Sequence, residues 1–327
     1  MLRLPPFRYV APRTLEEAVA ILAEGGPDAA AMSGGTDLLP HMKRRQRTPA
    51  LVVGLRHLRE LRGIHRTPEG GITVGAACTL HHVSHDPEVL LQYPALADAA
   101  AQVASPTLRR MGSIGGNLCI ETRCTYFDLP EHTRIASGRC LKDGGNICLA
   151  APSSPRCWAI ASSDTAPLLI ALGAQVRLVG PDGERVILLQ NLYRHDGLRP
   201  LALRPAEILT EILLPPADGL RAVYRKVRRR GSIDFPLVGV AAALRSNGGS
   251  LIEDARIVVG AVASAPLVAV EAGRQLVGRP LDADAIAAAA SAAAYPARPL
   301  DNADLAGAWR KHMVRVTVER ALRGLAL

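Results

Sequence analysis

Aromatic residues are scarce in this chain of 327 residues, which holds 3 Phe, 2 Trp and 6 Tyr. So few rings leave little surface on which unpaired bases can stack, and this argues against a protein that binds single-stranded nucleic acid. The formal net charge is +9, but the 39 basic residues are nearly all arginine and are spread along the whole chain. An Arg-rich, metal-binding protein that binds nucleic acid is therefore kept only as a rival interpretation.

Long hydrophobic runs are also lacking. The residues after Met1 contain no apolar stretch of signal-peptide length, and the least polar run, 285–295, is too short to cross a bilayer. We therefore expect a soluble, cytoplasmic protein. In a reducing compartment its six cysteines are not expected to form disulfides, so their clustering needs another explanation.

The chain is about twice as long as a typical domain, so two or three packed units are expected. Residues 1–55 alternate strands and helices, with strands at 29–32 and 50–53, and are α/β in character. Residues 56–217 form a larger unit that ends in a strand at 208–214. In the third unit, 221–327, we expect the strands 222–228, 238–244 and 255–262, a turn at 247–249, and the helices 266–276, 283–294 and 305–322.

Two glycine turns stand out, Ser-Gly-Gly-Thr-Asp at 33–37 and Gly-Ser-Ile-Gly-Gly-Asn at 112–117. Neither matches a dinucleotide-fold G-x-G-x-x-G or a phosphate loop. Because glycine lets the backbone approach a ligand closely, the N–H groups of the two turns could together hold a pyrophosphate. The alternative is a pair of ordinary turns between a strand and a helix.

Residues 121–160 lose hydrophobic periodicity and are interpreted as a loop insertion held by something other than its own core. Four of the six cysteines lie there: Cys124, Cys140, Cys148 and Cys157. Structural zinc sites usually draw ligands from close C-x2-4-C pairs, whereas four widely separated thiolates suit a larger group such as a 4Fe-4S cluster. Structural zinc and four unrelated thiols are the alternatives. We expect Cys78 in the core and assign Cys119 no role.

A strand around residues 224–228 would place Tyr224, Lys226 and Arg228 on one face. A solvated, charged edge strand is one interpretation of this stretch. A cation directed at a flavin or at its phosphates is the other.

Four segments, taken in order, resemble the FAD-binding medium subunit of the molybdenum hydroxylases, the family of xanthine dehydrogenase and carbon monoxide dehydrogenase. They are AMSGGTDL at 31–38, SIGGN at 113–117, Ser-Asp at 163–164, and YRK at 224–226 with the following DFPLVG. The position and spacing of the four cysteines resemble the β subunit of 4-hydroxybenzoyl-CoA reductase, which carries an extra 4Fe-4S cluster.

The resemblance covers nearly the whole chain and implies an α+β fold. A two-lobed, PCMH-type FAD-binding domain would consist of lobe 1 at 1–55 and lobe 2 at 56–217, with the cluster insertion at about 121–160. A C-terminal domain of the CO dehydrogenase flavoprotein type, 221–327, would carry a three-stranded antiparallel sheet and helices.

The resemblance also implies the ligands of both cofactors. FAD would be held by Ala31, Met32, Ser33, Gly34, Gly35, Thr36, Asp37, Leu38, Val103, Ser113, Ile114, Gly115, Gly116, Asn117, Asp164 and Lys226. The 4Fe-4S cluster would be held by Cys124, Cys140, Cys148 and Cys157. No residue of this chain is expected to act on the substrate.

The chain has no cysteine set for 2Fe-2S centres and no identifiable molybdopterin site, so partner subunits must supply both. The resemblance implies a dimer of heterotrimers. FAD exchanges one or two electrons and a cluster exchanges one, which suits an electron-transfer subunit. In the reductase-like interpretation, ferredoxin or another redox protein supplies electrons that remove the phenolic hydroxyl of an aryl-CoA thioester. In the alternative, a xanthine, aldehyde or CO dehydrogenase-type hydroxylase, electrons leave molybdenum and pass through FAD to an acceptor.

Overall fold

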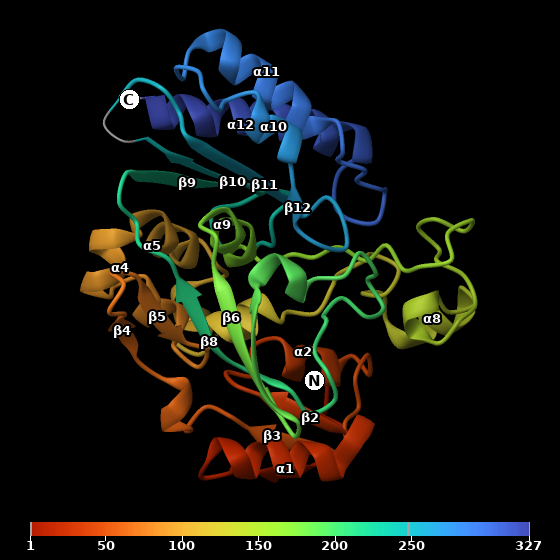
Figure 1. Ribbon diagram of the computed structural model, residues 1–327. Coiled ribbons are helices and arrows are strands. Elements are labelled where there is room, and N and C mark those ends of the chain that lie inside the picture. The colour runs from red at the N-terminus through yellow and green to blue at the C-terminus, as the bar shows by residue number, and fades with distance from the viewer. Residues whose placement is uncertain (1, 247–248, 327) are drawn as a thin grey trace.

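The computed structural model describes residues 2–246 and 249–326 (Figure 1). The strands are β1 (Arg8–Val10), β2 (Ala29–Met32), β3 (Leu51–Gly54), β4 (Ile64–Arg66), β5 (Ile72–Gly75), β6 (Gln175–Gly180), β7 (Gly183–Leu188), β8 (Ile208–Leu214), β9 (Leu220–Val227), β10 (Val238–Arg245), β11 (Asp254–Gly260) and β12 (Leu267–Val268). The α-helices are α1 (Leu15–Gly25), α2 (Leu38–Lys43), α3 (Leu80–Val83), α4 (Pro87–Gln92), α5 (Pro94–Ala101), α6 (Pro106–Arg109), α7 (Ile114–Leu118), α8 (Glu131–Ala136), α9 (Thr165–Ala171), α10 (Val270–Arg274), α11 (Ala283–Ala294) and α12 (Gly307–Ala326). Short 3-10 helices are η1 (Gly26–Asp28), η2 (Arg59–Leu61), η3 (Leu141–Asp143) and η4 (Leu189–Leu192).

The N-terminal residues form a small parallel sheet of order β1-β3-β2, with α1 packed beside it (Figure 1). Thr14 caps α1, because its hydroxyl accepts the N–H of Glu17 at 3.1 Å. The buried stripe of this helix includes Val19 and Leu22, which share a hydrophobic cluster with Leu51 of β3. The strand–helix–strand pattern expected for residues 1–55 is therefore confirmed.

The middle of the molecule holds an antiparallel sheet of order β4-β5-β8-β6-β7. Its strand β8 has the bounds expected from the sequence, and it joins β5 to β6 although the two lie about a hundred residues apart in the chain. Helices α5, α7 and α9 complete the largest hydrophobic core around this sheet. Every residue of α9 is buried, so this helix lies in the interior between the middle sheet and the C-terminal one.

The C-terminal sheet has four strands in the order β12-β11-β10-β9, which corrects the expected three-stranded sheet. The missed strand, β12, is only two residues long, Leu267 and Val268, and it pairs with β11. For the same reason the helix expected at 266–276 is shorter, because its first residues are extended in the sheet and α10 begins at Val270. Helices α11 and α12 are confirmed. Of the turn expected at 247–249, residues 247 and 248 lie outside the described residues.

Residues 121–160, hereafter the cysteine segment, project at the right of Figure 1 and contain α8. The expectation that this segment has no core of its own is wrong. It encloses a small hydrophobic cluster: Cys124, Phe127, Cys140, Cys157 and Ala159. The C-terminal domain holds the segment from outside, since the Asn302 side chain donates to the Trp158 carbonyl at 2.7 Å and the Asn302 carbonyl accepts the N–H of Thr125 at 2.9 Å.

Candidate functional site

A cavity of about 450 Å³, hereafter the central cavity, lies where three parts of the chain meet. These are the turn from β2 into α2, the turn into α7, and residues 233–235 of the C-terminal domain. The volume falls within the range of cofactor pockets. Most of the sequence-predicted FAD ligands line it: Ala31, Met32, Ser33, Gly34, Gly35, Thr36, Asp37, Leu38, Val103, Ser113, Gly116, Asn117 and Asp164.

Three of the predicted FAD ligands lie behind the cavity wall instead. Ile114 is fully buried in the main core. Gly115 packs on Ala76, because a Cβ at Gly115 would lie 2.7 Å from the Ala76 Cβ. The Lys226 side chain is also fully buried and reaches the back of Asp164 rather than the cavity. These residues support the wall from behind, and their assignment as FAD ligands stays a prediction.

The two glycines of the first turn serve the packing of the loop. Gly35 has a φ of +70°, a conformation that other residues rarely adopt. A Cβ at Gly34 would lie 1.9 Å from the carbonyl oxygen of Met111, so only glycine lets the first turn touch the chain that leads into the second. Close packing between the two turns therefore brings them to one cavity.

In the second turn, Gly116 is the glycine that leaves room for a ligand. The Ser113 hydroxyl accepts the N–H of Gly116 at 3.1 Å and so caps α7. A Cβ at Gly116 would meet only that hydroxyl, at 3.0 Å, and would otherwise point into the central cavity. The missing Cβ therefore forms part of the space that a cofactor would fill.

A buried polar network closes the back of the cavity. The Asp164 carboxylate accepts from the Lys226 ammonium at 2.9 Å and from the Tyr224 hydroxyl at 2.9 Å. Burial raises the pKa of Asp164 and lowers that of Lys226, while their attraction opposes both shifts. Beside them, the Asn117 carboxamide oxygen accepts from the hydroxyls of Ser163 and Thr165 at 2.8 and 2.7 Å. The polar groups of this wall therefore find their hydrogen-bond partners within the chain.

Several residues that line the cavity were not predicted from the sequence: His41, Arg44, Arg47, Cys119, Arg123 and Phe235. A signal for His41 was present, because residues four apart on a helix share a face and Asp37 precedes it by four. The imidazole Nε2 lies 3.4 Å from the Asp37 carboxylate. Burial alone raises the pKa of Asp37, but His41, the Glu121 N–H and Arg123 together bring it below its usual value. Cys119, which had no assigned role, also lines the cavity, and burial raises its pKa to about 12.

All four cysteines of the cysteine segment are buried, and Cys148 lies next to the small cluster formed by the other three. Burial raises the pKa of Cys124 and of Cys157 to about 11, and neighbouring thiols of the set add to both shifts. Across residues 2–246 and 249–326, no three His, Cys, Asp or Glu side chains converge closely enough to bind one metal ion. Cys78 lies in the core as expected, with its thiol 3.3 Å from the Gly63 carbonyl.

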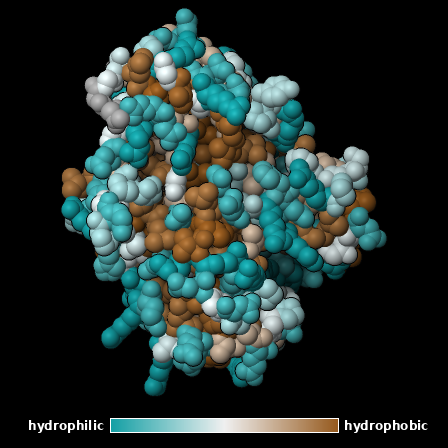
Figure 2. All heavy atoms as spheres, viewed as in Figure 1, coloured by the Kyte–Doolittle hydropathy of each residue, from teal (hydrophilic) through white to brown (hydrophobic). Residues whose placement is uncertain are grey.

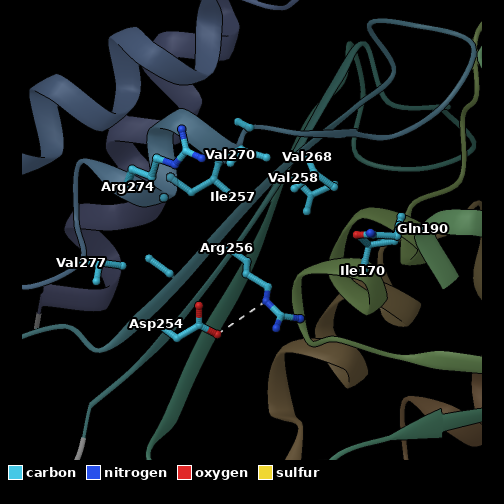
Figure 3. Close-up of a pocket in the computed structure, with 13 residues that line it drawn as sticks. Ile170, Gln190, Asp254, Arg256, Ile257, Val258, Val268, Val270, Arg274 and Val277 are labelled. Atoms are coloured by element: carbon cyan, nitrogen blue, oxygen red, sulfur yellow. Dashed lines mark ion pairs between the residues drawn. The ribbon is translucent and has the colours of Figure 1, made fainter. Parts of the chain in front are cut away.

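A second cavity of similar size, about 470 Å³, lies between β11, β12 and α10 on one side and α9 and η4 on the other (Figure 3). None of the sequence-predicted site residues lines it. Its arginines pair with neighbouring carboxylates at the surface: Arg256 with Asp254 at 3.5 Å and Arg274 with Glu271 at 3.4 Å. Figure 2 shows that hydrophobic side chains also gather over the middle of the molecular face seen there. Size alone therefore does not identify the cofactor site, whereas the converging polar groups of the central cavity do.

Comparison with known proteins identifies the family. Residues 5–217 match the FAD binding domain in molybdopterin dehydrogenase, and residues 222–325 match the CO dehydrogenase flavoprotein C-terminal domain. The carbon monoxide dehydrogenase medium chain of Afipia carboxidovorans is 31% identical, over 97% of this chain and 95% of that one. The aldehyde oxidoreductase FAD-binding subunit of Escherichia coli is 34% identical, over 80% and 82% of the two chains.

The fold agrees with these matches. A chain of the reconstituted CO dehydrogenase from Oligotropha carboxidovorans superposes with a TM-score of 0.81 at 28% identity, over 98% of both chains. No helix in the described part of the chain is long and apolar enough to cross a membrane. The matches extend over both domains and include the segments that form the central cavity. This chain therefore belongs to the FAD-binding medium subunits of the molybdenum hydroxylase family, and it is an oxidoreductase subunit that binds FAD.

Proposed function

We propose that this chain is the electron-transfer subunit of a hydroxylase-type complex of the xanthine, aldehyde or CO dehydrogenase kind. In that complex it receives electrons from partner subunits that carry molybdopterin and 2Fe-2S centres, and it passes them to an external acceptor. The observation that carries the proposal is the central cavity, whose two glycine turns converge on one space beside Gly116. The identity of 34% with an aldehyde oxidoreductase FAD-binding subunit favours an aldehyde as the electron source.

The residues of this chain would bind and orient FAD rather than act on the substrate. FAD supplies the exchange of one or two electrons. We propose that the thirteen predicted residues that line the central cavity contact it. Ile114, Gly115 and Lys226 would hold that wall from behind. The units 1–55, 56–217 and 221–327 are the proposed structural division of the chain.

Anaerobic reduction of the purified complex tests this function. We expect an aldehyde to bleach the flavin absorbance when the chain is purified with its partners, and an added acceptor to restore it. The isolated chain should not respond to the aldehyde, because we propose that a partner subunit carries the substrate site. A complex whose flavin is not reduced by aldehydes, xanthine or CO would contradict the hydroxylase-type function.

We further propose that Cys124, Cys140, Cys148 and Cys157 hold a 4Fe-4S cluster. The four thiols are buried in one segment. Four thiolates are the ligands that a cubane cluster takes. Backbone N–H groups already face the sulfurs, since the Ala159 N–H donates to the Cys157 Sγ at 3.4 Å. A zinc ion would require the sulfurs to converge on one point, whereas a cluster holds them further apart. Iron, sulfide and zinc analysis of anaerobically purified protein tests the assignment.

The cysteine segment also favours a second candidate, a complex like 4-hydroxybenzoyl-CoA reductase. There the electrons would run the other way, from ferredoxin or another redox protein into this chain and on to the molybdenum partner. Such a complex should remove the phenolic hydroxyl of an aryl-CoA thioester when reduced ferredoxin is supplied. The aldehyde experiment separates the two readings, because only a hydroxylase-type complex takes electrons from the aldehyde. In either reading the proposed assembly is a dimer of heterotrimers.

A further inference from the structure

Helix α2 and the residues just after it form a wall that two sites share. On one side, Leu38, His41, Arg44 and Arg47 line the central cavity. On the other side, the same stretch contacts the cysteine segment, where the buried Arg134 guanidinium donates to the Arg44 carbonyl at 3.2 Å. The sequence did not predict that the central cavity and the cysteine segment would be neighbours. A displacement of α2 would therefore change contacts in both the central cavity and the cysteine segment.

The hydrogen-bond partners of Gln46 fix the orientation of its side-chain amide. Its side-chain NH2 donates to the Phe127 carbonyl at 2.7 Å and to the Asp128 carboxylate at 3.2 Å. Both of these oxygens are acceptors only, so the amide cannot be flipped. The Gln46 oxygen therefore faces His41 and accepts from the imidazole Nδ1–H at 2.7 Å. One side chain thus connects a cavity residue to the backbone of the cysteine segment.

Two further contacts follow the same route. The His41 ring stacks on Phe127 with 6.4 Å between ring centroids, and Phe127 belongs to the small cluster that contains the cysteines. One turn earlier, the Asp37 carboxylate accepts the N–H of Glu121 at 3.1 Å. The Glu121 carboxylate in turn accepts from the buried Lys142 ammonium at 2.7 Å, in the middle of the cysteine segment. The cysteine segment therefore contacts α2, or the residue just before it, at both places.

We propose that Gln46 and His41 are positioning residues that couple FAD binding in the central cavity to the order of the cysteine segment. Neither the sequence pattern nor the comparisons assign them a role. Filling the cavity holds α2 in place, which holds Phe127 and the segment core, and the effect is reciprocal because the two equilibria share one free energy of coupling. The inference rests on FAD binding in the central cavity and needs no metal in the cysteine segment.

Gln46→Glu separates the two halves of the contact. The new carboxylate still accepts from His41, but it cannot donate to the Phe127 carbonyl and it repels Asp128. We expect the FAD dissociation constant of the 327-residue chain, measured by flavin fluorescence, to rise about tenfold, the size of a typical coupling. In the unchanged chain, FAD should slow protease cleavage within residues 121–160. In Gln46→Glu, FAD should no longer slow it.

His41→Phe provides the second variant, because it keeps the ring against Phe127 but loses the bond to Gln46. Because His41 also lines the central cavity, the measurement that decides is cleavage within residues 121–160, which FAD should no longer slow in this variant. This variant decides the question if Gln46→Glu does not fold. Gln190→Glu is the matched control, since Gln190 is exposed and does not line the central cavity. Unchanged FAD affinity in a folded variant overturns the inference, and so does protection of the segment by FAD as strong as in the unchanged chain.

Discussion

Helix α2 separates the central cavity from the small core of the cysteine segment, although Arg123 of the segment also lines the cavity, and the two sites are built in different ways. The wall of the cavity is complete without a ligand: Ser113 caps α7, and Asp164 has both of its hydrogen-bond donors in place. The cysteine segment has one short helix, α8, and a small core that consists largely of cysteine side chains. The first site is held by the fold around it, whereas the second, in our proposal, would be held by a cluster that joins its thiols.

This difference predicts how each site responds to damage. A change in the cavity wall should affect cofactor affinity or the stability of the whole domain, because the wall is continuous with the main core. A change among the four thiols should affect the cysteine segment first, because few other buried groups hold it. The following predictions test this contrast, from the largest expected effect to the smallest.

Cys157→Ser should have the largest effect. We expect the chain to lose the iron of the proposed cluster and cleavage within residues 121–160 to become faster, because the segment loses its shared ligand. FAD should still bind, although more weakly. Iron analysis and limited proteolysis measure the two effects. Cys78→Ser is the control, since Cys78 lies in the main core, and equal iron contents in the two variants would contradict the cluster assignment.

Gly116→Val should abolish measurable FAD binding while the chain remains folded. The new side chain occupies the space that the missing Cβ leaves in the central cavity. Fluorescence titration with FAD measures the loss, and circular dichroism checks the fold. Gly324→Val is the control, because Gly324 is also helical and its Cβ would meet only the end of the Arg225 side chain, at 3.1 Å. FAD affinity that survives Gly116→Val would place the cofactor elsewhere.

Lys226→Met should lower the free energy of unfolding by about 3 kcal/mol, because it leaves the Asp164 carboxylate buried without its cation. Urea unfolding followed by circular dichroism measures the change. The double variant Asp164→Asn, Lys226→Met should recover most of it, since both charges are then gone. If the single variant is as stable as the unchanged chain, the pair does not support the cavity wall.

Asp37→Asn should have the smallest effect, and that effect should depend on pH. The pKa of Asp37 is lower in the folded chain than its usual value of 3.8, so its ionised form adds stability above that value. This contribution is lost as the pH falls below 3.8 toward the lowered pKa. Unfolding free energies of the two chains should therefore differ near neutral pH and converge in acid. A difference that grows in acid would reverse the assigned sign.

Local patterns in the sequence were sufficient for many elements. The strands at 29–32 and 208–214 follow from residues that are neighbours in the chain. The two-residue strand β12 could not be predicted in this way, because it exists only through pairing with β11. The small core of the cysteine segment was missed for a related reason, since Phe127 and the cysteines are brought together by tertiary contacts and show no periodicity.

The candidate site divides along the same line. The sequence by itself determined which turns carry glycine and where the four thiols lie along the chain, because these are properties of residue type and local spacing. Only the tertiary structure decided that Gly116 faces the central cavity while Gly115 packs on Ala76, and that Lys226 stands behind Asp164. It also decided that Gln46, which follows α2, hydrogen-bonds to the cysteine segment. The physical reason is that facing, burial and neighbourhood depend on contacts between residues far apart in the chain, which no local pattern records.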